Sequence, residues 1–122
     1  MLYVLQPLVE RILGAEVKPA YSYAWIYRQG AELPVHRDRD ACRATVSLLV
    51  DYAPVVEGPT PWPLGIYPRG GGAAIEIRQA VGDAVIFNGQ ELRHFRPRFT
   101  AGTHSISLLL HYVDRDFSGV MF

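Results

Sequence analysis

The sequence predicts a mostly-β domain with one short N-terminal helix, and three observations support this. Helical spacing of apolar side chains occurs only near the N-terminus. About eight short apolar runs follow, each bounded by glycine, proline or other turn-forming residues. The 122 residues are 49% hydrophobic, which suffices for one core. Short strands at regular intervals are typical of antiparallel sandwiches and barrels, so we expect a single domain over residues 1–122.

The helix is predicted over Leu5–Leu13. Its apolar residues recur every three or four positions and therefore share one face. Pro7 suits a first helical turn, where the backbone N–H has no partner within the helix. Gly14 suits the position just after the last turn, so it should end the helix.

The strands are predicted from short runs of β-branched, aromatic and other apolar residues. They cover Tyr21–Tyr27, Leu33–Arg37, Arg43–Tyr52, Trp62–Tyr67, Ala73–Arg78, Ala84–Asn88, Leu92–Phe95 and His104–Val113. The four prolines of residues 53–63 exclude regular structure before Trp62. We expect residues 114–122 to form a loop that packs its aromatic side chains on the body of the domain.

Charge and cysteine usage exclude several classes of protein. The 12 basic residues balance the 12 acidic ones, which argues against a whole-surface grip on nucleic acid or an anionic membrane. No apolar run reaches the length of a membrane span. Cys42 is the only cysteine, which excludes a disulfide framework; we interpret it as a small strand residue. The N-terminus lacks a signal-peptide pattern, so a cytoplasmic protein is expected.

A metal site is the strongest functional signal in the sequence. His36 and Asp38 are two residues apart, so on a strand their side chains point to the same side, roughly 7 Å apart. His94, at the end of a later apolar segment, is the best third ligand. Two imidazoles and one carboxylate on one face of an iron ion leave positions open for oxygen and substrate.

Several motifs around these residues resemble the iron(II)- and 2-oxoglutarate-dependent oxygenase superfamily, especially its prolyl-hydroxylase-like branch. They are the segment Tyr27–Asp38 with a tyrosine, a glycine turn and HxD, the segment Gly82–Phe87, then His94, Pro97 and Gly102–Thr103. The resemblance covers about residues 21–113. It implies a double-stranded β-helix, or jelly roll. It also implies His36, Asp38 and His94 as iron ligands and Tyr27 as a hydrogen-bond partner of the cosubstrate 2-oxoglutarate.

The resemblance leaves the second carboxylate of 2-oxoglutarate without its usual partner. The family has arginine or lysine about ten residues after the distal histidine, where this chain has His104. Alternation places His104 on what we interpret as the inner face of its strand, so we expect it to bind this carboxylate. Arg96 and Arg98, which alternate with His94, are the other candidates.

Other polar residues are interpreted as structural. His111 lies on the opposite face of its strand from His104, so it is expected to be structural or surface-exposed. Arg43, Thr45 and Ser47 share a polar face, which is usually the solvated side of a sheet.

These observations favour an oxygenase that uses Fe(II), 2-oxoglutarate and O₂ to hydroxylate an unidentified organic substrate. By this resemblance Asp38 favours hydroxylation or desaturation over halogenation, since the related halogenases have glycine or alanine there. The small size favours an open site and a peptide or protein substrate, with Trp62 in the proline-rich loop overhanging the site. The alternatives are a cupin-like metal-binding protein and a non-catalytic jelly-roll binding module.

Overall fold

The computed structural model describes residues 1–39 and 43–119, in which one helix and eight strands alternate with loops. The elements are α1 (Leu2–Leu13), β1 (Val17–Arg28), β2 (Leu33–His36), β3 (Ala44–Ala53), β4 (Leu64–Ile66), β5 (Ile75–Ile77), β6 (Ala84–Phe87), β7 (His94–Arg96) and β8 (His104–Asp114). The predicted mostly-β class with a short N-terminal helix is confirmed. Cys42 lies outside the described residues.

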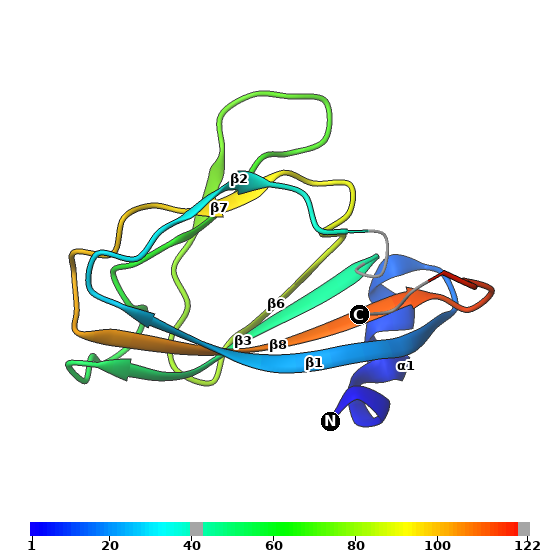
Figure 1. The fold of residues 1–122 in the computed structure, drawn as a ribbon, viewed down its shortest axis with the longest axis horizontal. Helices are drawn as coiled ribbons and strands as arrows, with labels where there is room; N and C mark the ends of the chain where they lie inside the picture. The colour runs from blue at the N-terminus through cyan, green and yellow to red at the C-terminus, as the bar shows by residue number, and fades with distance from the viewer. Residues whose placement is uncertain (40–42, 120–122) are drawn as a thin grey trace.

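The strands form two four-stranded antiparallel sheets that face each other (Figure 1). The first sheet has the order β1-β8-β3-β6, and the second has the order β2-β7-β4-β5. Neighbouring strands are mostly distant in sequence, as in a jelly roll. Helix α1 packs on the outer face of the first sheet, away from the second (Figure 1).

Helix α1 begins at Leu2, three residues before the predicted start, so Pro7 lies inside it rather than in its first turn. Packing on the sheet explains the earlier start: Val9 is fully buried, and the hydroxyl of Tyr112 donates a 2.7 Å hydrogen bond to the carbonyl of Leu2. Gly14 ends the helix as expected. It adopts a left-handed conformation, and its N–H donates to the carbonyl of Glu10.

The two faces of the first sheet differ in chemistry, and the pairing of β3 with β8 explains why. Val46 pairs with Leu110 and faces the helix, within the main apolar cluster. The next pair along, Thr45 with His111, faces the second sheet. The first sheet therefore packs its apolar face against α1 and turns polar side chains such as Thr45 and His111 towards the second sheet.

The proline-rich loop does not place Trp62 over the site, so that expectation is wrong. Trp62 is only 4% exposed, stacks on Phe99 with 4.5 Å between ring centroids, and donates a hydrogen bond from Nε1 to the carbonyl of Pro97. A large aromatic ring is stabilised more by burial than by exposure at a loop tip, and its indole N–H finds a partner there.

Close packing of Phe95 on Gly65 joins the central strands β7 and β4. The two residues pair across the strands, and a methyl group at position 65 would collide with the Phe95 ring. We therefore expect Gly65→Ala to lower the free energy of unfolding by about 1–3 kcal/mol, as overpacked sites do. Urea denaturation measures this change. Adding Phe95→Leu should recover part of the loss, and an unchanged midpoint in Gly65→Ala would contradict the packing described.

Candidate metal centre

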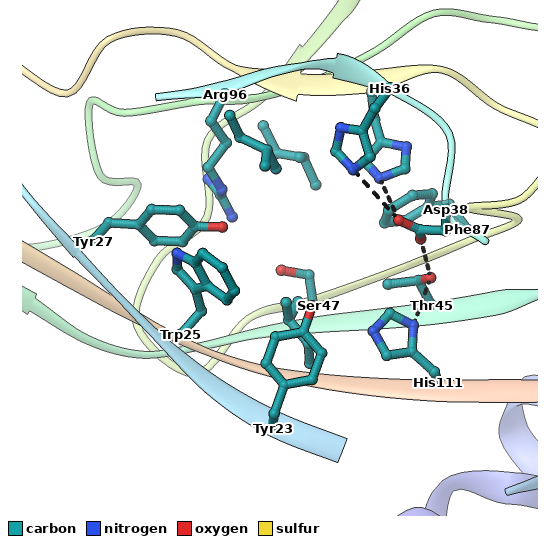
Figure 2. Close-up of a pocket in the computed structure, with 14 residues that line it drawn as sticks. Tyr23, Trp25, Tyr27, His36, Asp38, Thr45, Ser47, Phe87, Arg96 and His111 are labelled. Carbon is teal, nitrogen blue, oxygen red and sulfur yellow. Dashed lines mark hydrogen bonds and ion pairs between the residues drawn. The ribbon is translucent and has the colours of Figure 1, made fainter. Parts of the chain in front are cut away.

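Three side chains, two on the second sheet and one in the loop after β2, meet at one end of the space between the sheets, and Figure 2 shows His36 and Asp38 of this group. His36 ends β2, His94 begins β7, and the two are paired across these strands. Asp38 follows two residues after His36, and one of its oxygens, Oδ1, lies 3.5 Å from Nε2 of His36 and 3.2 Å from Nε2 of His94. One donor atom from each residue lies within 4.8 Å of the others. The structure brings together all three predicted ligands.

The backbone fixes the tautomer of both histidines. Nδ1 of His36 lies 2.8 Å from the carbonyl of Pro34, and Nδ1 of His94 lies 2.8 Å from the carbonyl of Leu92. A carbonyl only accepts, so Nδ1 carries a hydrogen in each ring, and Nε2 is the ring nitrogen directed at Asp38. Either a hydrogen on Nε2, as in the 3.2 Å contact of His94 with Asp38, or a metal ion must lie between such a nitrogen and the carboxylate. This donor set therefore fits a divalent metal ion, whose histidine ligands usually have such backbone partners.

The carboxyl of Asp38 is ionised, as a metal ligand must be. Burial acts to raise its pKa and is the largest single influence, but hydrogen bonds with His94 and Thr45, together with electrostatic interactions with His94 and His111, hold the pKa below its usual value. Oδ2 of Asp38 accepts a 2.7 Å hydrogen bond from the hydroxyl of Thr45. The N–H of Asp38 donates to the carbonyl of Gly89, which fixes the backbone of this residue too.

The three residues line a cavity of about 130 Å³ between the two sheets. Its walls are mainly aromatic and apolar, and its further lining residues are Tyr23, Trp25, Tyr27, Leu33, Thr45, Ser47, Leu64, Phe87, Arg96, Leu109 and His111. The cavity is smaller than the roughly 300 Å³ typical of sites for drug-sized ligands. It can therefore enclose a small molecule and admit only the edge of a larger one.

Arg96 provides the only positive side chain of this cavity lining within the described residues. It follows His94 by two positions on β7 and is only 5% exposed. Burial lowers the pKa of its guanidinium, whereas the phenol oxygen of Tyr27 raises it through charge and a hydrogen bond. Among the described residues, no carboxylate forms an ion pair with Arg96. A buried guanidinium without an anion is costly, so this end of the cavity is suited to a carboxylate.

Neighbouring groups hold Arg96 in place. Its guanidinium lies over the ring of Trp62, 4.9 Å from the centroid, and 3.4 Å from Oε1 of Gln79. The amide nitrogen of Gln79 donates to the carbonyls of Ser47 and Asp83, which turns Oε1 towards the arginine. The cation is therefore oriented before any ligand binds.

His104 and Arg98 do not reach this cavity. The expectation that His104 faces inward is wrong: Nε2 of His104 lies 2.9 Å from Oδ2 of Asp51, and the ring is outside the cavity lining. Arg98 is exposed. The face that carries His104 also carries Leu108 and Leu110, and this apolar face packs towards α1 rather than towards the second sheet.

Three residues interpreted as structural or solvated line the cavity instead. Thr45 and Ser47 are each 3% exposed, and so is His111. The sequence of β8 contains a pattern that indicates this cavity, because serines alternate there with the apolar residues. Such a polar face on a buried strand indicates a lined cavity when the apolar face has a helix to cover it. Arg43, from the same predicted polar face, instead forms an ion pair in which its Nη1 donates to both carboxylate oxygens of Asp114.

No family model and no curated protein matches this sequence. Among solved structures, AviO1 from Streptomyces viridochromogenes Tue57 superposes with a TM-score of 0.75 at 20% identity, covering 95% of this chain and 59% of that one. A Pseudomonas putida prolyl-4-hydroxylase gives a TM-score of 0.68 at 20% identity, with 93% and 62% covered. A 2OG-Fe(II) oxygenase family member from Burkholderia pseudomallei gives 0.69 at 18% identity, with 88% and 51% covered.

The chain thus spans about three-fifths of the length of the first of these structures. At such identities the likeness concerns the fold. In the described residues, no helix has the length and apolar character needed to cross a lipid bilayer. The order of the strands, the two facing sheets and the superpositions agree, and the chain has a jelly-roll fold, which it shares with these solved structures.

Proposed function

We propose that this protein is an iron(II)- and 2-oxoglutarate-dependent dioxygenase that hydroxylates an organic substrate. The observation that carries the proposal is the pair of sites in one cavity: a His-Asp-His cluster suited to a metal and a buried arginine without a carboxylate partner. A diacid that binds the metal at one end and the arginine at the other satisfies both. A cupin-like metal-binding protein has no need of the second site.

In this proposal His36, Asp38 and His94 hold the iron. Arg96 binds the distal carboxylate of 2-oxoglutarate through two parallel N–H donors, the geometry that favours arginine over lysine. Two residues along a strand span roughly 7 Å, so His94 and Arg96 hold the metal and the carboxylate at a separation that suits a short diacid.

Tyr27 supports the same carboxylate. Burial raises the pKa of its phenol, and the adjacent Arg96 lowers it, so the phenol stays protonated at neutral pH and can donate a hydrogen bond. Its ring packs against Trp62 with 5.0 Å between centroids, which fixes the direction of the hydroxyl. His104 and Arg98 have no role in this proposal.

When bound, iron and 2-oxoglutarate supply the oxidation: O₂ and the diacid give succinate and CO₂, and the second oxygen atom becomes the hydroxyl group of the product. The protein orients the diacid and excludes water through the apolar side chains around the cluster, including Leu64 and Phe87. The Phe87 ring meets the His94 ring edge to face at 4.8 Å and fixes its plane.

The substrate reaches the cluster past Tyr23 and Trp25, because the cavity itself is sized for the cosubstrate. Trp25 is 46% exposed and Tyr23 is 36% exposed, so both rings offer apolar surface at the opening. A peptide or protein segment that presents one side chain remains our proposal for the substrate, and the cytoplasm for the location. The exposed rings of Tyr23 and Trp25 support the first, and the lone cysteine supports the second.

The metal ligands can be tested without a substrate. We expect the purified protein to bind about one Mn²⁺ per chain, and His36→Ala or His94→Ala to weaken binding by more than the roughly 10–100-fold cost of losing an outer partner. Isothermal titration calorimetry measures the dissociation constant. His104→Ala is the matched control, since it removes a histidine outside the cavity. Equal affinity in all four proteins would rule out the ligand set.

The cosubstrate anchor gives a second prediction. We expect Arg96→Gln to raise the dissociation constant of 2-oxoglutarate by about 10- to 150-fold, the cost of a charge-assisted hydrogen bond. Arg96→Lys should lie between wild type and Arg96→Gln, because it keeps the charge and loses the planar pair of donors. Titration of the anaerobic, metal-loaded protein measures these constants, with thermal unfolding as a check on folding.

Arg98→Ala and His104→Ala serve as controls and should bind 2-oxoglutarate as the wild type does. Wild-type binding should also change little between pH 6 and pH 8, since a guanidinium stays charged throughout. If only His104→Ala lost 2-oxoglutarate binding, and wild-type binding depended strongly on pH, His104 and not Arg96 would be the partner of the distal carboxylate. Metal binding without any affinity for 2-oxoglutarate would favour the cupin-like alternative.

A further inference from the structure

The two oxygens of Asp38 have different partners. Oδ1 faces the Nε2 atoms of His36 and His94, where the metal is proposed to bind. Oδ2 points the other way, towards the first sheet, and accepts the hydrogen bond from Thr45 (Figure 2). Behind Thr45, its hydroxyl oxygen lies 3.2 Å from Nδ1 of His111. A chain of hydrogen bonds therefore runs from β8 through β3 to the carboxylate.

We infer that Thr45 and His111 are positioning residues. Their chain of hydrogen bonds to Oδ2, here called the relay, restricts Asp38 to a single metal-binding oxygen. This inference rests on the proposed function, because it takes the His-Asp-His cluster as the metal site. No residue of the relay other than Asp38 touches the metal. The relay acts by occupying Oδ2 and by fixing the rotation of the carboxylate.

The direction of each hydrogen bond in the relay follows from elementary chemistry. Ionised Asp38 only accepts, so the single hydroxyl hydrogen of Thr45 goes to Oδ2. The hydroxyl oxygen of Thr45 then has only lone pairs left for His111, so Nδ1 of His111 must carry a hydrogen. The charge of Asp38 thereby sets the tautomer of a histidine two hydrogen bonds away.

The surroundings of His111 keep it neutral and in one orientation. The ring is 3% exposed, and burial is the main reason that its pKa falls to about 4, despite the nearby charge of Asp38. Its Nε2 has no hydrogen-bond partner within the part of the chain that is described. The rings of Tyr21 and Tyr23 pack on it, with centroids 4.8 Å and 5.6 Å away. A neutral ring held in this way donates from Nδ1 to Thr45 alone.

Strand pairing and a glycine leave room for the hydrogen bonds of the relay. Thr45 and His111 are direct partners in the β3–β8 pairing, so the register of the first sheet sets their separation. Gly89 packs against the junction with Asp38, and a methyl group there would collide with Oδ2 of Asp38 and with the Thr45 hydroxyl. The same glycine accepts the backbone hydrogen bond of Asp38. A larger residue at position 89 would break the contact between the sheets.

A carboxylate that binds through one oxygen leaves more of the metal available. With three single-atom ligands on one face, the remaining positions of a six-coordinate ion can take both donor atoms of a chelating cosubstrate and one further ligand. If Oδ2 also bound, it would take one of those positions. The relay therefore keeps a position open that the proposed reaction requires.

The test compares Thr45→Val, which keeps the shape and removes the hydroxyl, with Thr45→Ser, which keeps the hydroxyl. The probe is Co²⁺, whose visible spectrum reports coordination number, and its affinity is measured by titration. We expect Thr45→Val to weaken Co²⁺ binding by about 10–100-fold, the usual cost of losing an outer partner, and to change the spectrum. Thr45→Ser should keep a Co²⁺ affinity and a visible spectrum close to those of the wild type.

Thr60→Val is the matched control. It also removes a buried threonine hydroxyl, one that donates a 2.6 Å hydrogen bond to the carbonyl of Gln79 and lies outside the cavity lining. It should bind Co²⁺ with the wild-type spectrum even if its melting temperature falls. A spectrum and affinity in Thr45→Val that match those of the wild type would overturn the relay.

The histidine tautomer provides a second readout that needs no metal. Nitrogen-15 NMR of the wild type should show His111 with hydrogen on Nδ1 and a bare Nε2 at pH 7. A hydrogen on Nε2 instead would overturn the relay. Failure of the wild type to bind any divalent metal would contradict the proposed function itself, whereas metal binding that Thr45→Val leaves unchanged would contradict the relay alone.

Discussion

The Asp38 carboxylate is the interaction on which the site depends, because it connects the two sheets. Its Oδ1 lies against the histidines of the second sheet, and its Oδ2 accepts the hydroxyl of Thr45 from the first. Burying this charge opposes ionisation, and only hydrogen bonds from both sheets make the charged form favourable. A shift of either sheet would therefore change both the cluster and the charge that it needs.

The division of the first sheet into an apolar and a polar face makes such a site possible in a small domain. Helix α1 covers the apolar face, so that face supplies the core. The space between the sheets can then hold polar groups, provided that each is held by a partner. Gln79 does this for Arg96, and Thr45 does it for Asp38. The cavity is thus ordered before a ligand enters it.

A single strand carries much of the proposed chemistry. His94 and Arg96 both belong to β7, which pairs with β2 on one side and β4 on the other. With the proposed ligand and anchor on one central strand, their spacing depends on the backbone and not on the length of a loop.

The sequence by itself predicted the mostly-β class and the residues of the cluster, because alternation and the HxD spacing are local properties of a strand. It did not predict which face of β8 points inward, and so His104 was preferred to Arg96 and His111 was set aside. Alternation identifies two faces but not their neighbours: only tertiary structure decided that α1 covers the side of Leu110 and that the second sheet covers the side of His111. The partners of Asp38 and Arg96 depend on strands far apart in the chain, and no local pattern specifies their register.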